Sequence, residues 1–269
     1  MLRCDGGRTA GNAGAVTPVR LARANPIAAC LLVVVAASLF FVAFPGVDLW
    51  FSELFYRSHG GFWLRRNDLL SFVRGTNDIL IAGVVVALLA SVAVKMARPE
   101  RPSPVPPNVA VFLFSTLILG PLLIVNVILK DHWGRPRPVQ VDAFGGDAPY
   151  VSVWRITDWC DSNCSFVSGE ASSAMWLVAV ALVLPRSGRV PAVAAAAASP
   201  LLLSLNLIAF GGHFLSDVLI SFALTLLVIA VMHRLVLERP PTWLRNEALE
   251  AAVTRLGLAI RGRKGQGTR

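Results

Sequence analysis

Residues 109–129 read VAVFLFSTLILGPLLIVNVIL, and residues 130–138, directly after them, read KDHWGRPRP. The first stretch contains no charged residue and has the roughly 20 residues that an α-helix needs to cross a bilayer. Its apolar residues are continuous, whereas a strand of a membrane β-barrel would alternate apolar and polar residues. The first stretch therefore predicts a membrane-spanning helix, and the basic stretch begins where that helix reaches the membrane surface.

The composition of the whole chain agrees with a membrane location. Of its 269 residues, 55% are hydrophobic and only 15% are charged, and the mean hydropathy is +0.63. Soluble domains carry about 25% charged residues, which argues against an ordinary soluble enzyme. The large apolar fraction also excludes an intrinsically disordered chain.

Six apolar stretches are candidates for spans, so we predict an all-α, polytopic membrane helical bundle with six transmembrane helices. The stretches are 26–44, 79–94, 109–129, 171–184, 190–210 and 214–236, of which the second and fourth are short. The predicted organisation is an N-terminal segment (1–25), a membrane domain (26–236) and a basic C-terminal tail (237–269). We expect the tail to be loosely ordered from about Glu247.

The basic residues predict the orientation of the bundle. With six spans, 17 of the 25 Lys and Arg residues fall on one side, and such an excess marks the cytoplasmic side. Both termini are then cytoplasmic, and the connections 45–78, 130–170 and 211–213 face the periplasm of a bacterial inner membrane. This distribution accounts for the net charge of +9 without nucleic acid as a partner.

Two of the four cysteines, Cys160 and Cys164, lie four residues apart in the large outer connection. A disulfide between them is possible if that side is oxidising, as the periplasm is, and the sequence leaves both states open. No further Cys or His lies at the spacing of metal ligands, so we predict no metal site.

The basic stretch after the third span carries Lys130, Arg135 and Arg137 within eight residues. Such a cluster suits a phosphate group, because Arg offers paired donors and Lys a point charge. The alternative is a basic anchor at the lipid headgroups. That alternative fits poorly, because these charges lie on the side that is otherwise depleted of them.

Two further clusters lie at the predicted outer ends of helices. Ser168 and Gly169 at a helix start leave backbone N–H groups free for an anion, and Glu170 after them could equally serve only to complement the helix dipole. His213 and Asp217 are four residues apart and share a helical face. A carboxylate beside an imidazole would select its tautomer and stabilise the imidazolium.

These clusters resemble the signatures of the type 2 phosphatidic acid phosphatase family. Lys130 followed by six residues and Arg137-Pro138 matches the first signature, Ser168-Gly169 the middle of the second, and His213 with Asp217 the end of the third. The resemblance covers about residues 26–236. The stretch 163–172, NCSFVSGEAS, makes the lipid A 4'-phosphatase branch the most similar.

The chain departs from the family pattern at several positions. The Pro and His of the second signature are Val167 and Glu170, and Asn-Leu stands at 206–207 where the third signature has Ser-Arg. One phosphate-binding Arg is therefore missing. Arg135 is a candidate substitute, and Arg155 is a weaker one.

The resemblance implies phosphoryl transfer through a phosphohistidine, without a metal or other cofactor. His213 would attack phosphorus, Asp217 would hold the other ring nitrogen, and Glu170 would protonate the leaving oxygen, with His132 as the alternative acid. The implied phosphate-binding residues are Lys130, Arg137, Arg135, Ser168 and Gly169.

The resulting prediction is an integral membrane lipid phosphatase, a metal-independent phosphoric monoester hydrolase. It would remove a phosphate monoester from a lipid headgroup, such as the 4' phosphate of lipid A. The alternative substrates are undecaprenyl diphosphate and phosphatidylglycerol phosphate. A phosphotransferase, or a membrane protein that binds lipid phosphate without turnover, would also fit these residues.

Overall fold

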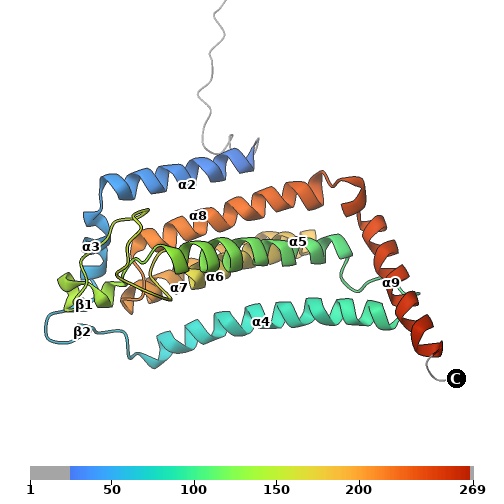
Figure 1. Cartoon of the computed structure of the whole chain (residues 1–269), viewed down its shortest axis with the longest axis horizontal. Coiled ribbons are helices and arrows are strands. Elements are labelled where there is room, and N and C mark those ends of the chain that lie inside the picture. The colour runs from blue at the N-terminus through green and yellow to red at the C-terminus, as the bar shows by residue number, and fades with distance from the viewer. Residues whose placement is uncertain (1–24, 267–269) are drawn as a thin grey trace, which may run out of the picture.

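The computed structural model describes residues 25–266, and long helices make up most of it. They run side by side as a bundle (Figure 1). The bundle helices are α2 (Pro26–Ala43), α4 (Asp68–Ala97), α5 (Pro107–Leu117) with its π-helical continuation η1 (Ile118–Lys130), α6 (Gly169–Leu182), α7 (Arg186–Ala209), and α8 (Leu215–Met232) with its continuation η4 (His233–Glu238).

Within residues 25–266, five of these helices are long and apolar enough to cross a membrane, and α6 is a shorter apolar helix of 14 residues. The six correspond to the six predicted stretches. Large apolar side chains such as Leu31, Leu32 and Leu39 of α2 are more than half exposed, which suits contact with lipid. The predicted fold class, an all-α polytopic membrane bundle, is confirmed, and the chain is a multi-pass membrane protein.

The helices differ in how far the protein itself encloses them. Phe41 is the only buried residue of α2, which packs mainly on α8. By contrast, most of α6 is buried among α7, α8 and η1. Trp176 of α6 is fully buried, and its Nε1 donates to Thr116 Oγ1 at 3.0 Å. The shortest bundle helix is therefore the central one.

Helix α4 begins 11 residues earlier than the predicted start at residue 79. The side chain of Asn67 caps it by accepting a hydrogen bond from Leu70 N at 3.1 Å, as short polar side chains at helix starts commonly do. The prediction followed the apolar run alone and so placed the preceding residues in a connection. As a result, Arg74 lies on a helix rather than in a loop.

One end of the bundle is closed by short elements, which gather at the left of Figure 1. Tyr56, Phe62 and Phe144 pack their rings there with centroids 5.3–5.6 Å apart. Together with Phe214 they form a small core beside the start of α8. The short elements are α3 (Gly46–Glu53), the antiparallel pair β1 (Tyr56–Arg57) and β2 (Gly61–Phe62), η2 (Pro138–Gln140) and η3 (Asp142–Phe144).

The opposite end carries η5 (Thr242–Leu244) and α9 (Asn246–Gln266), which packs across α4 and α5 (Figure 1). The expectation of a loosely ordered tail from about Glu247 was wrong. Glu250 forms an ion pair with the buried Lys95 at 2.6 Å. Gly257 packs closely against Pro99, so that a larger side chain there would press on it. A buried ammonium needs an anionic partner, and the helix supplies one. The predicted segment 1–25 lies almost wholly outside the described residues.

Candidate active site

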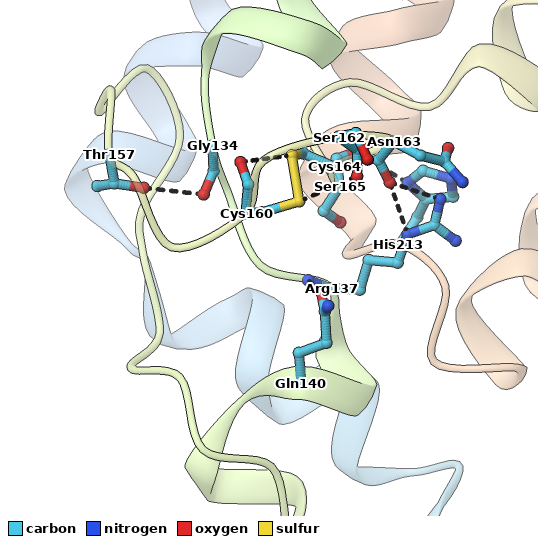
Figure 2. Close-up of a disulfide and its surroundings, with 10 residues drawn as sticks. All are labelled: Gly134, Arg137, Gln140, Thr157, Cys160, Ser162, Asn163, Cys164, Ser165 and His213. Atoms are coloured by element: carbon cyan, nitrogen blue, oxygen red, sulfur yellow. Dashed lines mark hydrogen bonds between the residues drawn. A yellow bond between two sulfur atoms is a disulfide. The ribbon is translucent and has the colours of Figure 1, made fainter.

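His213 lies in the turn between α7 and α8, where Gly211 adopts a φ of 67° that favours glycine. The ring is buried, and its Nδ1 lies 2.8 Å from the backbone carbonyl oxygen of Ser165 (Figure 2). A carbonyl only accepts hydrogen bonds, so Nδ1 carries the ring proton and Nε2 keeps its lone pair. Burial, followed by the charges of Lys130 and Arg137, holds the pKa of His213 well below its ordinary value. The ring is therefore neutral, with Nε2 available as a nucleophile.

Asp217 does not contact the ring of His213, so the predicted pairing of the two is wrong. Asp217 Oδ2 accepts from Ser165 Oγ at 2.6 Å and from Phe214 N at 2.8 Å, while Oδ1 pairs with Arg135. The carboxylate turns back to the start of its own helix, where unpaired N–H groups attract it. Asp217 thus supports His213 indirectly, through the serine whose carbonyl receives the ring proton.

Arg135 is fully buried and is not a phosphate ligand, which overturns that prediction. Its Nε donates to Val151 O at 2.7 Å and its Nη1 to Ser216 Oγ at 2.9 Å and to Asp217. Its Nη2 donates to Asp48 Oδ2 at 2.8 Å and to Tyr150 Oη at 3.3 Å. All five N–H groups of the guanidinium therefore have partners. The sequence concealed this arrangement because Asp48 comes from α3, far away along the chain.

Lys130 and Arg137 lie near His213, as the resemblance implied: both are close enough for their charges to lower the pKa of its ring. Arg137 donates from Nε and Nη2 to the carbonyl oxygen of Asn163, at 3.0 and 2.8 Å (Figure 2). Among residues 25–266 its Nη1 has no hydrogen-bond partner, and neither does the Lys130 ammonium. These donors can meet an incoming anion.

Glu170 lies in the first turn of α6 and is paired with Arg74 of α4, a residue that the sequence reasoning missed. Arg74 Nε donates to Glu170 Oε2 at 2.7 Å, and Nη2 donates to Oε1. Both side chains stay partly exposed, at 39% and 30%. The charge of Arg74 also acts on His213. The one available signal was an arginine flanking an apolar run on the predicted outer side.

The start of α6 fits the predicted anion contact in part. Ser168 N donates to Asp217 O at 3.2 Å, and Ser168 Oγ accepts from Ala171 N at 3.3 Å. Its backbone N–H is therefore occupied, while its hydroxyl hydrogen has no acceptor among the described residues and can meet an anion. In the described part of the chain, the N–H groups of Gly169 and Glu170 donate to no group outside the helix, as expected for the first turn. A side chain at position 169 would collide with Asn126.

Cys160 and Cys164 are joined by a disulfide with a Cα–Cα distance of 5.8 Å. The state that the sequence left open is therefore the bonded one. No group of three or more His, Cys, Asp or Glu side chains gathers as a metal-binding cluster in residues 25–266.

Comparison with known proteins identifies the family. Residues 108–241 match the PAP2 superfamily. A lipid A 4'-phosphatase of Rhizobium leguminosarum is 39% identical over 210 residues, which cover 71% of this chain and 88% of that protein. The chain belongs to the PAP2 superfamily. A lipid A 4'-phosphatase of Francisella tularensis subsp. novicida is 35% identical over 215 residues, covering 76% of this PAP2 chain and 94% of that relative. No solved structure matches the chain.

The match begins in α5 and ends just after η4, so it includes all three sequence clusters. It confirms the resemblance drawn from Lys130, Arg137 and His213. It leaves out α4, and therefore Arg74.

Proposed function

We propose that this PAP2 protein is a lipid phosphatase that removes the 4' phosphate of lipid A. The observation that carries the proposal is a neutral, buried His213 whose Nδ1 is committed to Ser165 O, beside Lys130 and Arg137. Relatives named lipid A 4'-phosphatase, 35–39% identical over most of their length, support the choice of substrate.

In the first step His213 Nε2 attacks phosphorus, and the bond from phosphorus to the lipid oxygen breaks. Lys130, Arg137 and the N–H groups of Gly169 and Glu170 bind the non-bridging oxygens. Fixed positive groups of this kind are the main catalytic device in phosphoryl transfer. Nδ1–H stays on Ser165 O, which stabilises the positive ring of the phosphohistidine. Water then attacks phosphorus and regenerates the histidine.

Arg74 replaces the arginine that the third signature lacks in this chain. It reaches the site from α4 and is the third cation near His213. Substrate phosphate competes with Glu170 for this guanidinium, since Arg binds phosphate and carboxylate with the same paired donors. Once Arg74 turns to phosphate, Glu170 takes up a proton from solvent and passes it to the leaving lipid oxygen; the resulting carboxylate then accepts a proton from the water that attacks the phosphohistidine.

The site is proposed to face the periplasm. The cation cluster lies at the end of the bundle closed by α3, β1 and β2, and α9 lies at the other end (Figure 1). The α9 end carries Lys95, Arg98 and Arg101 as well as the basic residues of α9 itself, and basic residues mark the cytoplasmic side. Both termini are then cytoplasmic, and the protein resides in a bacterial inner membrane.

The test is phosphate release from purified lipids by the detergent-solubilised protein. Lipid A, undecaprenyl diphosphate and phosphatidylglycerol phosphate serve as parallel substrates, and mass spectrometry locates the phosphate that is lost. We expect fastest release from the 4' position of lipid A. Faster release from another lipid would overturn the substrate, and release by His213→Ala at the wild-type rate would overturn the nucleophile. Binding of all three lipids without release would leave a non-catalytic protein.

A further inference from the structure

The loop closed by the Cys160–Cys164 disulfide touches both the nucleophile and a phosphate-binding residue. The carbonyl oxygen of Asn163, inside the loop, accepts two hydrogen bonds from Arg137, at 3.0 and 2.8 Å. The carbonyl oxygen of Ser165, one residue beyond the loop, accepts the Nδ1 proton of His213 at 2.8 Å. Figure 2 shows the sulfur–sulfur bond beside these three contacts.

Both contacts use backbone carbonyls, so the path of the chain, rather than any side chain of the loop, determines where they point. No helix or strand lies between η3 and α6, residues 145–168. Thr157 N is bonded to Trp133 O and Ser165 N to Arg135 O, but the described chain shows no backbone hydrogen bond from residues 158–164. Residues 158–164 are therefore held by the disulfide and by the contacts of Arg137 with Asn163 O, whereas Ser165 beyond them is also held by Arg135 O and Asp217.

The two cysteines lie at different depths, one near the protein surface and one beside the residues that contact His213. Cys164 is fully buried next to Ser165, whereas Cys160 is partly exposed. Asn163 between them is exposed and adopts a φ of 52°, a left-handed conformation that asparagine and glycine tolerate better than other residues. A bond across five residues removes most of the alternatives open to such a segment.

We propose that the Cys160–Cys164 disulfide is a positioning element of the active site, which sets the Asn163 and Ser165 carbonyls and thereby orients Arg137 and His213. The proposal rests on the proposed phosphatase function. Asp217 and Arg135 O hold Ser165 from one side, and the disulfide holds the chain that enters it from the other. Without the bond the Ser165 carbonyl loses part of its alignment with Nδ1, and a histidine protonated on Nε2 cannot attack phosphorus through that nitrogen. Arg137 at the same time loses the acceptor that aims its remaining N–H groups. Disulfides persist in the periplasm, where the site is proposed to lie.

The experiment compares the wild type, Cys30→Ser and the double variant Cys160→Ser/Cys164→Ser, before and after treatment with a phosphine reductant. Cys30 is the matched control, since it is a free cysteine of α2. Reduction should lower the kcat of the wild type and of Cys30→Ser at least about tenfold, because small misplacements of reacting groups are costly. The double variant should have that lower kcat before treatment, and the reductant should not change it. The proposal would be overturned if reduction left the kcat of the wild type unchanged, or if reduction lowered the kcat of the double variant as much as that of the wild type.

A general loss of folded protein would lower kcat equally at every pH, whereas altered surroundings of His213 would move the profile. We expect reduction to shift the acid limb of kcat/KM to higher pH, because the ring gains contact with water while Lys130, Arg137 and Arg74 remain. An unshifted limb counts against positioning. Asn163→Gly should retain activity and Asn163→Val should lose it, since glycine accepts the left-handed backbone and a β-branched residue does not; equal activities would contradict the loop's role.

A readout without turnover separates this proposal from the proposed function. Diethyl pyrocarbonate modifies accessible neutral imidazoles, and mass spectrometry can follow its attachment to His213. Modification should be slow in the wild type, faster after reduction, and fast in the double variant in both conditions. If oxidised wild type releases no phosphate yet shows this pattern, the phosphatase function fails and the positioning role stands. If phosphate is released but reduction changes neither rate, the positioning role fails alone.

Discussion

Arg135 and Arg137 are two residues apart on one loop, yet their guanidinium groups belong to different regions. Arg135 lies in a buried ion cluster with two carboxylates, Asp48 and Asp217, and every one of its N–H groups has a partner. Arg137 lies in an open cation cluster with Lys130 and Arg74, around His213.

The two clusters differ in their balance of charge. The buried cluster has one cation and two carboxylates, whereas the open cluster has three cations and one carboxylate, Glu170. Buried charges are tolerated when they are paired and hydrogen-bonded. The open cluster keeps unpaired donors and an excess of positive charge, which a phosphate can complete. The balance of charge, rather than the presence of an arginine, distinguishes the buried structural cluster from the cluster that is suited to bind a phosphate.

Removing the centre of the open cluster should have the largest effect. His213→Ala should lower kcat on the order of 10⁴-fold or more, as loss of a covalent nucleophile does, with little change in thermal unfolding. Phosphate release and Tm measured on the same preparation check this. His132→Ala is the matched control, since His132 lies on the surface with Nδ1 near Val127 O and Ile128 O. A larger loss in the control would move the catalytic role to His132.

The second prediction compares alanine substitutions of the two arginines of the loop. Arg135→Ala should lower the free energy of unfolding by about 3–5 kcal/mol, since it leaves Asp48 and Asp217 buried without a cation. Arg137→Ala should cost less than about 1 kcal/mol in stability but reduce kcat/KM. Chemical unfolding and phosphate release measured in parallel test the contrast. Equal destabilisation by both would erase the distinction between the clusters.

The third prediction concerns Arg74. Arg74→Ala should lower kcat/KM about 10²- to 10³-fold, because it removes a charge-assisted phosphate ligand. Arg74→Lys should recover only part of this, since Lys lacks the paired donors. Arg66→Ala, an exposed residue near the start of α4, is the control and should be silent. Full activity of Arg74→Ala would leave its pairing with Glu170 purely structural.

The smallest expected effect is on the pH profile. The pKa of His213 is lowered, so its ring stays neutral, and nucleophilic, below the ordinary pKa of about 6.5. The acid limb of kcat/KM should therefore lie below pH 6.5. Lys130→Met removes one of the cations that lower this pKa, so the limb should move to higher pH. A limb above pH 6.5 in the wild type would show that the ring is charged in the free enzyme.

The helices and two of the chemical clusters could be predicted from local sequence. A continuous apolar run near 20 residues crosses a bilayer as a helix wherever it stands, so five spans and the shorter α6 followed directly. Lys130 and Arg137 are held close by the short chain between them. His213 could be predicted as a site residue because it follows a double glycine at the end of an apolar run.

Partners far apart in the chain could not be predicted in this way. Asp217 was expected on His213 because the two are four residues apart, yet the ring meets Ser165, 48 residues away. Arg135 was expected to bind substrate, but Asp48 reaches it from 87 residues away. Glu170 was recognised while its partner Arg74, 96 residues away, was not.

The sequence by itself thus determined the membrane architecture, the family and the side chains that can carry phosphoryl chemistry, because apolar length and short-range spacing follow from the chain alone. Tertiary structure decided which of those side chains are consumed by burial and which are left open. A buried charge must find its counter-charge at whatever distance along the chain it lies. Arg135 is therefore paired with carboxylates of α3 and α8, while Arg137 is paired with no carboxylate among the described residues and keeps a donor for the proposed substrate.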